Sequence, residues 1–128
     1  MASLRERLLK NTSIKNTNYL SESKFFNKKD MITTSVPMIN VALSGEVDGG
    51  LTPGLTMLAG PSKHFKTAFS LLLASAYLKR YKDDDVAILF YDSEFGTPQS
   101  YFSTFDIPLE SVVHTPISDV EMLKQDIM

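Results

Sequence analysis

The stretch GPSKHFKT at residues 60–67 combines residue types and a spacing that can bind phosphate. It follows the phosphate-loop pattern G-x-x-x-x-G-K-[ST] at Gly60, Lys66 and Thr67, but carries Phe65 where the pattern has its second glycine. In such loops, backbone N–H groups surround the β- and γ-phosphates, a lysine neutralises them, and a hydroxyl binds Mg²⁺. The stretch therefore predicts a site for ATP with Mg²⁺. The alternative is a lysine-containing loop that only happens to follow a strand.

The expected nucleotide-binding residues are those of the loop itself. Lys66 is also assigned a catalytic role, because its charge would offset that of the phosphates, and Thr67 is the expected magnesium ligand. His64 is expected to offer its backbone N–H group, with its imidazole variable and exposed. The complete set in the loop is Gly60, Pro61, Ser62, Lys63, His64, Phe65, Lys66 and Thr67.

A carboxylate follows the next apolar run of the chain. Residues 86–92 (VAILFYD) are typical of a parallel strand covered on both faces, and Glu94 lies just beyond them. At the carboxyl end of a parallel strand, a carboxylate faces the crevice where a nucleotide would lie and can act on water there. A solvated acid after a strand is the alternative. Asp92 and Ser93 fit either support of magnesium-bound water or a turn, and His114 is expected to be a strand-end residue.

Three elements must position these groups. Residues 55–59 (LTMLA) are predicted to form a short buried strand that leads directly into the loop. Residues 67–81 have the length and composition of a helix packed on a sheet, and residues 86–92 form the next strand. Strand, loop, helix and strand together make a βαβ unit.

Further elements follow with their own start signals. Thr97 and Pro98 form an N-cap and N1 pair for a short helix, and residues 111–116 (SVVHTP) are typical of a strand. Ser118 and Glu121 then have the spacing of a capping box for a last helix.

The N-terminal part has a different character. Ser3 and Glu6 have capping-box spacing at the start of a short amphipathic helix over residues 3–10, and residues 11–18 are a polar linker. The β-branched run at residues 31–36 (MITTSV) predicts a strand.

Composition limits the class of protein. With 128 residues, of which 43% are hydrophobic, the chain can bury one core, and its net charge of −2 gives no general attraction for a polyanion. The absence of cysteine excludes disulfides and thiolate chemistry. The longest apolar stretch, residues 68–78, is shorter than the roughly 20 residues that span a bilayer, and no secretory signal begins the chain. We therefore expect a cytoplasmic protein without membrane contacts.

Two long runs resemble one known family. Residues 36–67 (VPMINVALSGEVDGGLTPGLTMLAGPSKHFKT) resemble the RecA-type run in which a short helix and a glycine-rich turn lead to the phosphate loop. Residues 89–96 (LFYDSEFG) and 97–116 (TPQSYFSTFDIPLESVVHTP) resemble the second strand, its glutamate and the segment beyond. The likeness covers about residues 31–128 and points to the RecA-like recombinases of T-even-type bacteriophages, the UvsX group, whose phosphate loop also lacks the second glycine.

This resemblance implies a fold and site roles. The fold class would be α/β, a RecA-like P-loop ATPase core with a mostly parallel sheet, incomplete, over residues 31–128, preceded by a helix–strand arm at residues 1–30. Glu94 matches the glutamate that polarises the attacking water, and Tyr101 matches the ring that stacks on adenine. Core packing of its own short helix is an equal alternative for Tyr101. Phe25 and Phe26 would either cover the core or help the arm to dock on a neighbouring protomer.

The implied function is that of an ATP-dependent DNA recombinase, which pairs homologous DNA and exchanges strands in phage recombination, repair and replication. The implied partners are single-stranded DNA, further copies in a filament, and phage single-strand-binding and mediator proteins, in the cytoplasm of an infected bacterium. The family's second acidic strand and DNA-binding loops are missing from these 128 residues. We therefore expect a partial chain, whose own enzymatic activity is left open. A non-catalytic interaction fragment and another P-loop ATPase or kinase are the alternatives.

Overall fold

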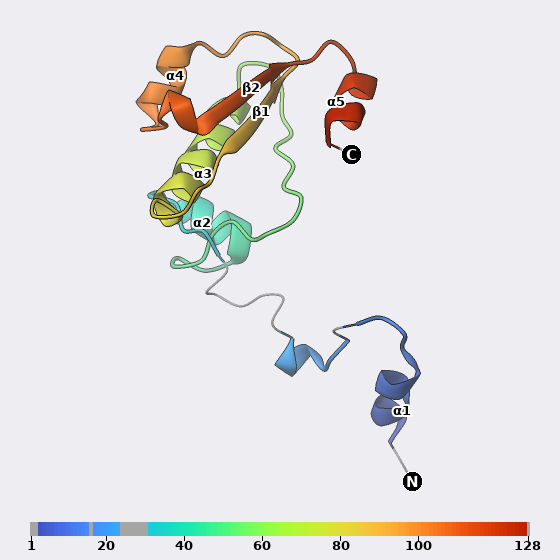
Figure 1. Ribbon diagram of the computed structural model, residues 1–128. Coiled ribbons are helices and arrows are strands. Elements are labelled where there is room, and N and C mark those ends of the chain that lie inside the picture. Colours follow the sequence, from blue (N-terminus) through green and yellow to red (C-terminus); the bar gives the residue numbers. More distant parts are fainter. Residues whose placement is uncertain (1–2, 16, 24–30, 128) are drawn as a thin grey trace.

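The computed structural model describes residues 3–15, 17–23 and 31–127, and it has an α/β architecture (Figure 1). Its helices are α1 (Leu4–Asn11), α2 (Pro37–Ser44), α3 (Lys66–Arg80), α4 (Gln99–Thr104) and α5 (Val120–Ile127). Its strands are β1 (Ile88–Asp92) and β2 (Val112–Pro116), and short 3-10 turns occur at η1 (Leu20–Glu22) and η4 (Leu109–Ser111). The predicted α/β class is confirmed at this level.

The two strands form a parallel pair. Ile88 lies opposite Val112 and Asp92 opposite Pro116, and the Ile117 N–H donates to the Asp92 carbonyl at 3.0 Å just beyond the pair. Parallel neighbours need a crossover between them, which α4 and η4 provide. The strands predicted at residues 86–92 and 111–116 are thus confirmed, and their carboxyl ends lie at the same edge of the sheet.

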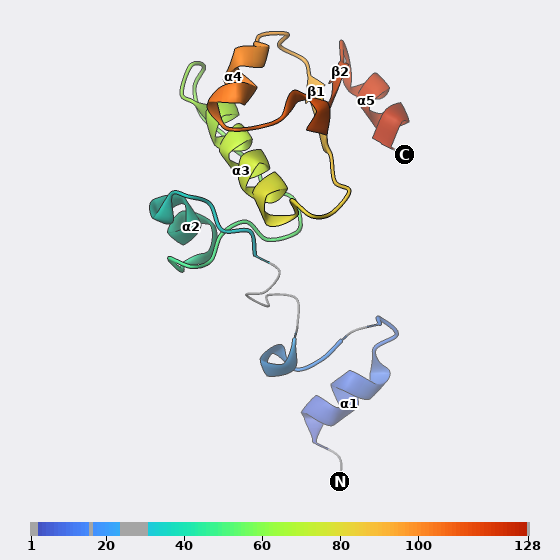
Figure 2. The same ribbon diagram turned by 60° about the vertical axis from the view of Figure 1, so that its left-hand side comes forward.

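Helix α3 packs against this sheet and supplies much of the core (Figures 1 and 2). Leu71 of α3, Phe102 of α4 and Ile107 form the buried cluster, with exposed fractions of 6% or less. Phe90 of β1 contacts Phe102 edge to face, with ring centroids 5.2 Å apart. The helix predicted after the loop is confirmed. Strand β1 and helix α3 thus pack around one core.

A buried amide fixes the segment before the loop. Asn40 of α2 is 1% exposed, and its side chain makes four hydrogen bonds of 2.8–3.1 Å to Thr34 and the Val47 carbonyl. The Ser44 hydroxyl in turn accepts the Gly50 N–H at 3.0 Å. These bonds satisfy the polar groups of a tight turn, as buried groups require. The short helix and glycine-rich turn that the resemblance implied are therefore present in the structure.

The other two predicted strands do not form as predicted. Within residues 31–36, only Ile32 pairs, in a single antiparallel bridge to Leu51. Residues 55–59 have no strand at all, and Leu55 and Met57 are 95% and 80% exposed. The apolar pattern of residues 55–59 suits a strand between two neighbours, but among the described residues no strand lies beside it to complete a ladder. The predicted βαβ unit accordingly lacks its first strand.

Two predicted helix starts are also shifted. Helix α4 begins at Gln99 with Pro98 as its N-cap, so Thr97 and Pro98 are one position too early for the predicted roles. At α5 the Asp119 carboxylate accepts the Met122 N–H at 2.8 Å, while Ser118 donates to the Asp119 side chain. The predicted Ser118–Glu121 capping box is therefore wrong, because the neighbouring carboxylate takes the capping position.

The N-terminal helix begins as predicted. Ser3 accepts the Glu6 N–H, and the Glu6 carboxylate accepts the Ser3 N–H at 2.8 Å, which completes the capping box of α1. In both ribbon views α1 lies apart from the sheet and α3 (Figures 1 and 2). Phe25 and Phe26, and the predicted boundary at residue 30, fall outside the described residues. Within the described ranges, no helix has both the length and the apolar character needed to cross a membrane.

Candidate functional site

The 60–67 loop contains two residues with left-handed backbone. Lys63 has φ 64° and Phe65 has φ 56°, and Phe65 is the residue that immediately precedes α3. Left-handed backbone is the conformation that glycine adopts without steric cost. The position at which the phosphate-loop pattern has its second glycine therefore keeps a glycine-like conformation, although the side chain is phenylalanine.

Lys66 and His64 both bond to carbonyls of their own loop. The Lys66 Nζ donates to the Pro61 carbonyl at 2.9 Å, and the His64 Nδ1 lies 2.9 Å from the Ser62 carbonyl. These contacts curl both side chains back over the turn. The lysine is thus held next to the backbone groups that would surround a phosphate.

The start of α3 adds to this electropositive environment. An α-helix leaves the N–H groups of its first turn without intrahelical acceptors, and its dipole favours an anion there. Lys66 and Thr67 are the first two residues of α3, which has 15 residues. A positively charged side chain, a hydroxyl and free N–H groups therefore meet at one helix end, an arrangement suited to phosphate.

A cavity of about 440 Å³ brings the predicted residues together. Its lining includes the loop from Ser62 to Thr67 and, from distant parts of the sequence, Glu94 and Tyr101. Gly60 and Pro61 do not line it, although the Pro61 carbonyl holds Lys66. The structure thus brings together eight of the ten predicted site residues.

A second, larger cavity adjoins the first. It has a volume of about 670 Å³ and shares Lys66, Thr67 and Glu94 with the smaller one. From there it extends along α3 between residues 51–58 and β1. Lys66, Thr67 and Glu94 therefore lie where the two cavities meet.

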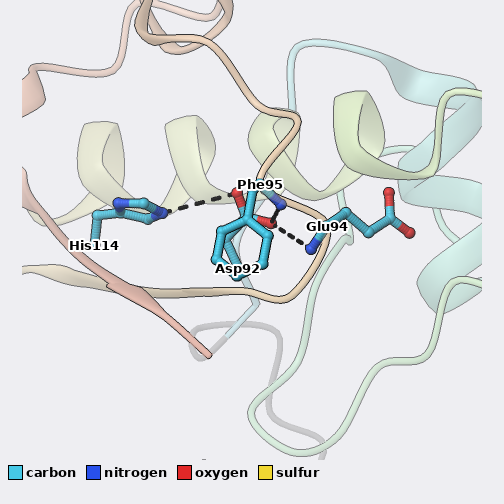
Figure 3. Close-up of polar contacts among 4 residues, drawn as sticks. All are labelled: Asp92, Glu94, Phe95 and His114. Atoms are coloured by element: carbon cyan, nitrogen blue, oxygen red, sulfur yellow. Dashed lines mark hydrogen bonds and ion pairs between the residues drawn. The ribbon is translucent and has the colours of Figure 1, made fainter. Parts of the chain in front are cut away.

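Glu94 sits on a turn that Asp92 organises (Figure 3). Asp92 is 7% exposed, and its Oδ1 accepts the N–H groups of Glu94 and Phe95, each at 2.9 Å. Of its two predicted interpretations, Asp92 thus has the role in a turn. The Glu94 carboxylate points away from Asp92 and stays available to the cavity (Figure 3).

Tyr101 fits both of its interpretations. It lines the 440 Å³ cavity, and it also packs against the core cluster and contacts Phe105 edge to face, with centroids 5.7 Å apart. Its ring is therefore held in place by core contacts while it borders the cavity. A ring fixed in this way can offer a flat surface to a planar base.

Sequence reasoning missed one partner of this region. His114, expected only to end a strand, lies in β2 with its Nε2 3.8 Å from the Asp92 Oδ2 (Figure 3). Its ring also stacks on Phe90, with centroids 5.7 Å apart. The contact follows from the register of the two strands. His114 lies opposite Phe90, and Asp92, two residues after Phe90, points to the same face of the sheet.

Comparison with known proteins finds a relative that aligns over the whole chain. No protein-family model matches the chain. Over its whole length of 128 residues, the chain is 46% identical to a protein named "Recombination and repair protein" from Enterobacteria phage T4. The chain spans about a third, 32%, of the length of that relative.

Proposed function

We propose that this chain carries the nucleotide-binding part of an ATP-dependent DNA recombinase that acts in recombination and repair. One observation carries the nucleotide part of this proposal: residues 62–67, Glu94 and Tyr101, distant in sequence, line a single cavity. Binding and hydrolysis of a nucleoside triphosphate require several groups around one cavity. These are a lysine, a hydroxyl and a helix N-terminus for the phosphates, a carboxylate for the water, and an aromatic ring for the base. The recombination part rests on the relative, whose name states recombination and repair.

In this proposal the triphosphate lies over the 60–67 loop. Lys66 leaves the Pro61 carbonyl for the β- and γ-phosphates, and the N–H groups at the start of α3 donate to phosphate oxygens. The Thr67 hydroxyl, which lines the cavity beside Lys66, would hold Mg²⁺, and the ion would offset phosphate charge. Tyr101 would contact the base.

Hydrolysis would use Glu94. Its carboxylate orients a water molecule whose oxygen attacks the γ-phosphorus, while the bond from that phosphorus to the β–γ bridging oxygen breaks. The products are ADP and inorganic phosphate, and the water proton passes to the carboxylate and then to solvent or phosphate. ATP would in this way act as a switch, with binding favouring an active assembly and hydrolysis releasing it.

The proposed partners are those of a recombinase. They are single-stranded DNA, further copies of the protein in a filament, and phage single-strand-binding and mediator proteins. A net charge of −2 gives this chain no general affinity for DNA, so we expect most DNA contacts to come from other parts of a longer protein. By itself the chain should bind nucleotide weakly and should not exchange strands.

Equilibrium binding of ATP with Mg²⁺ tests the proposal. Lys66→Ala should weaken binding at least about tenfold, equivalent to about 1.4 kcal/mol, because it removes the charge next to the phosphates. Calorimetric or fluorescence titration of the chain measures this. Glu94→Gln should bind as the unchanged chain does, since a water-orienting carboxylate contributes to hydrolysis and little to affinity.

Lys82→Ala is the matched control. Lys82 is an exposed lysine just beyond the other end of α3, so its loss changes the net charge equally without touching the loop. Equal losses of ATP affinity in both lysine variants would mean that only the net charge matters. That outcome would contradict a specific role of the loop. If the unchanged chain shows no binding at all, these residues do not form a nucleotide site in this chain.

A further inference from the structure

We propose that His114 is a positioning residue for Glu94 and acts through Asp92. The proposal extends the proposed function, because the position of Glu94 matters to hydrolysis only if Glu94 orients the water. It concerns Asp92 and His114, two side chains that are not among the residues proposed above to hold the nucleotide. They lie on neighbouring strands, on the far side of the turn from the Glu94 carboxylate (Figure 3).

The Asp92 carboxylate determines where the turn begins. It is 7% exposed, and Oδ1 is shared by two N–H groups, those of Glu94 and Phe95, each at 2.9 Å. Phe95 has φ 52°, a left-handed conformation that is strained for an aromatic residue and must be held by its surroundings. Any rotation of the carboxylate would therefore move both N–H groups and the Glu94 backbone with them.

The second oxygen of Asp92 faces His114. The Nε2–Oδ2 distance is 3.8 Å, which is too long for a hydrogen bond but suits an ion pair once the imidazole is protonated. The position of the ring is fixed by two constraints: strand pairing puts His114 opposite Phe90, and the two rings stack. Phe90 in turn contacts buried Phe102, so the histidine is anchored to the core.

No other charged side chain borders the His114 side of this pair in the part of the chain that the structure describes. The side chain of His114 is 52% exposed and can exchange protons with solvent, whereas that of Asp92 is 8% exposed. On its other side, His114 borders a cavity of about 360 Å³ whose remaining lining residues carry no charge: Thr97, Pro98, Gln99, Phe102, Leu109 and Val112. Within the described ranges, Asp92 is thus the ionisable group paired with His114.

Protonation of His114 should draw the two side chains together. A charge-assisted hydrogen bond has a donor–acceptor distance of about 2.7–2.9 Å, so the pair would close from its 3.8 Å separation. Because Asp92 holds the turn through its other oxygen, this closure is transmitted to Glu94. Displacements of about 1 Å can change a catalysed rate up to about 10²-fold, so the charge on His114 would set the reactivity of Glu94.

Amide NMR of the chain without nucleotide tests this inference. The N–H signals of Glu94 and Phe95 should shift with pH, and the midpoint of that shift should equal the one recorded on the His114 ring protons. His114→Phe keeps a ring against Phe90 and removes both nitrogens. In that variant the shift of the two amides should disappear, while the rest of the spectrum stays that of the folded chain.

His64 provides the internal control. It is the other histidine of the chain and lines the same cavity as Glu94, so it is the second side chain through which pH could act on Glu94. His64→Gln should leave the Glu94 and Phe95 midpoint unchanged. Amides that follow His64, or that do not titrate while His114 does, would overturn the inference. Because no nucleotide is present, these outcomes are independent of whether the chain binds ATP.

Discussion

Phe65 holds the left-handed backbone conformation at the position where the phosphate-loop pattern has a glycine. Left-handed backbone costs a non-glycine residue roughly 1–2 kcal/mol, and the Phe65 side chain, at 71% exposure, gains little packing in return. The strain must therefore be supported by the start of α3 and the turn before it. A departure from the sequence pattern here does not mean a departure from the loop geometry.

Phe65→Gly should consequently be tolerated. Relief of strain is offset by the greater entropy of glycine in the unfolded chain, so the free energy of unfolding should change by less than about 1 kcal/mol. Phe65→Ile should lower it by about 1–2 kcal/mol, because a β-branched residue fits left-handed backbone poorly. Urea unfolding followed by circular dichroism measures both. Similar losses in the two variants would show that the phenyl ring, rather than the backbone, matters at this position.

Site residues could be predicted from the sequence where they are neighbours in the chain, and could not where they meet only through the fold. The loop residues 62–67 could be predicted from a local pattern and Glu94 from the strand before it, and the structure places them around one cavity. The contact between Asp92 and His114 depends on which strands pair and in which register. No single-sequence pattern gives that pairing, so the contact could only be seen in the structure.

Helices and strands also differ in how far they could be predicted from local sequence. Helix α1 was predicted from its capping box, which acts within a few residues, and α3 from the length and composition of its apolar run. The strand predicted at residues 55–59 was wrong in this chain, because a strand exists only with a hydrogen-bonding neighbour. The capping box predicted for α5 failed for another local reason: Asp119 takes the capping position one residue later, where its carboxylate accepts the Met122 N–H, and Ser118 donates to Asp119 instead.

Gly50 tests the glycine-rich turn. It has φ 147°, and a Cβ there would lie 2.1 Å from the Ile32 carbonyl oxygen. Ile32 is also the residue that forms the antiparallel bridge with Leu51. Gly50→Ala should lower the free energy of unfolding by about 1–3 kcal/mol for backbone strain plus about 1–3 kcal/mol for the clash. Denaturant unfolding measures the loss.

Gly54→Ala is the matched comparison, since Gly54 has φ 135° but open space around it. It should show the strain contribution alone. Should the two variants lose equal stability, steric contact with Ile32 contributes nothing and the bridge is free to move aside.

Helix α5 is joined to the sheet by a hydrogen bond that responds to pH. The Tyr91 hydroxyl donates to the Asp126 Oδ2 at 2.6 Å, and this bond raises the pKa of Tyr91 above its ordinary value of 10.0. A raised pKa in the folded state means that the contact stabilises fully below the unfolded pKa and is lost as pH rises through the folded one. A phenolate would also repel Asp126.

Asp126→Asn should therefore let Tyr91 ionise at lower pH. Ultraviolet titration of tyrosinate should show one of the five tyrosines shifted down. Asp84→Asn, at an exposed turn beyond α3, should leave the curve unchanged. An unaltered curve in Asp126→Asn would mean that α5 does not hold this position against β1 in solution.

At the scale of the whole molecule, the larger cavity lies between the edge of β1 that does not face β2 and the irregular segment 51–58. β1 pairs with β2 on one side, and residues 51–58 run along the cavity on the other. Leu55 and Met57 of this segment are 95% and 80% exposed, and Leu89 of β1 is 63% exposed. Exposed strand edges and apolar side chains favour association, so the chain should self-associate through this region.

Leu55→Lys should weaken that association. A lysine adds charge at an already exposed position, so it should shift the sedimentation profile toward the monomer without loss of folded structure. Val47→Lys, in the turn after α2 and 60% exposed, changes charge equally and should have little effect. The region is excluded as the interface if both variants sediment as the unchanged chain does.

The bond from Lys66 to the Pro61 carbonyl has a consequence for selectivity. An arriving ligand does not meet a solvated cation; it must compete with a neutral acceptor that the loop already supplies. A nucleoside, which has no negative charge, has little to offer in that exchange, whereas a triphosphate offers several anionic oxygens. In the proposed site, the loop would therefore select ligands by charge before any contact with the base, and a weaker or stronger acceptor at the Pro61 carbonyl would change that selectivity.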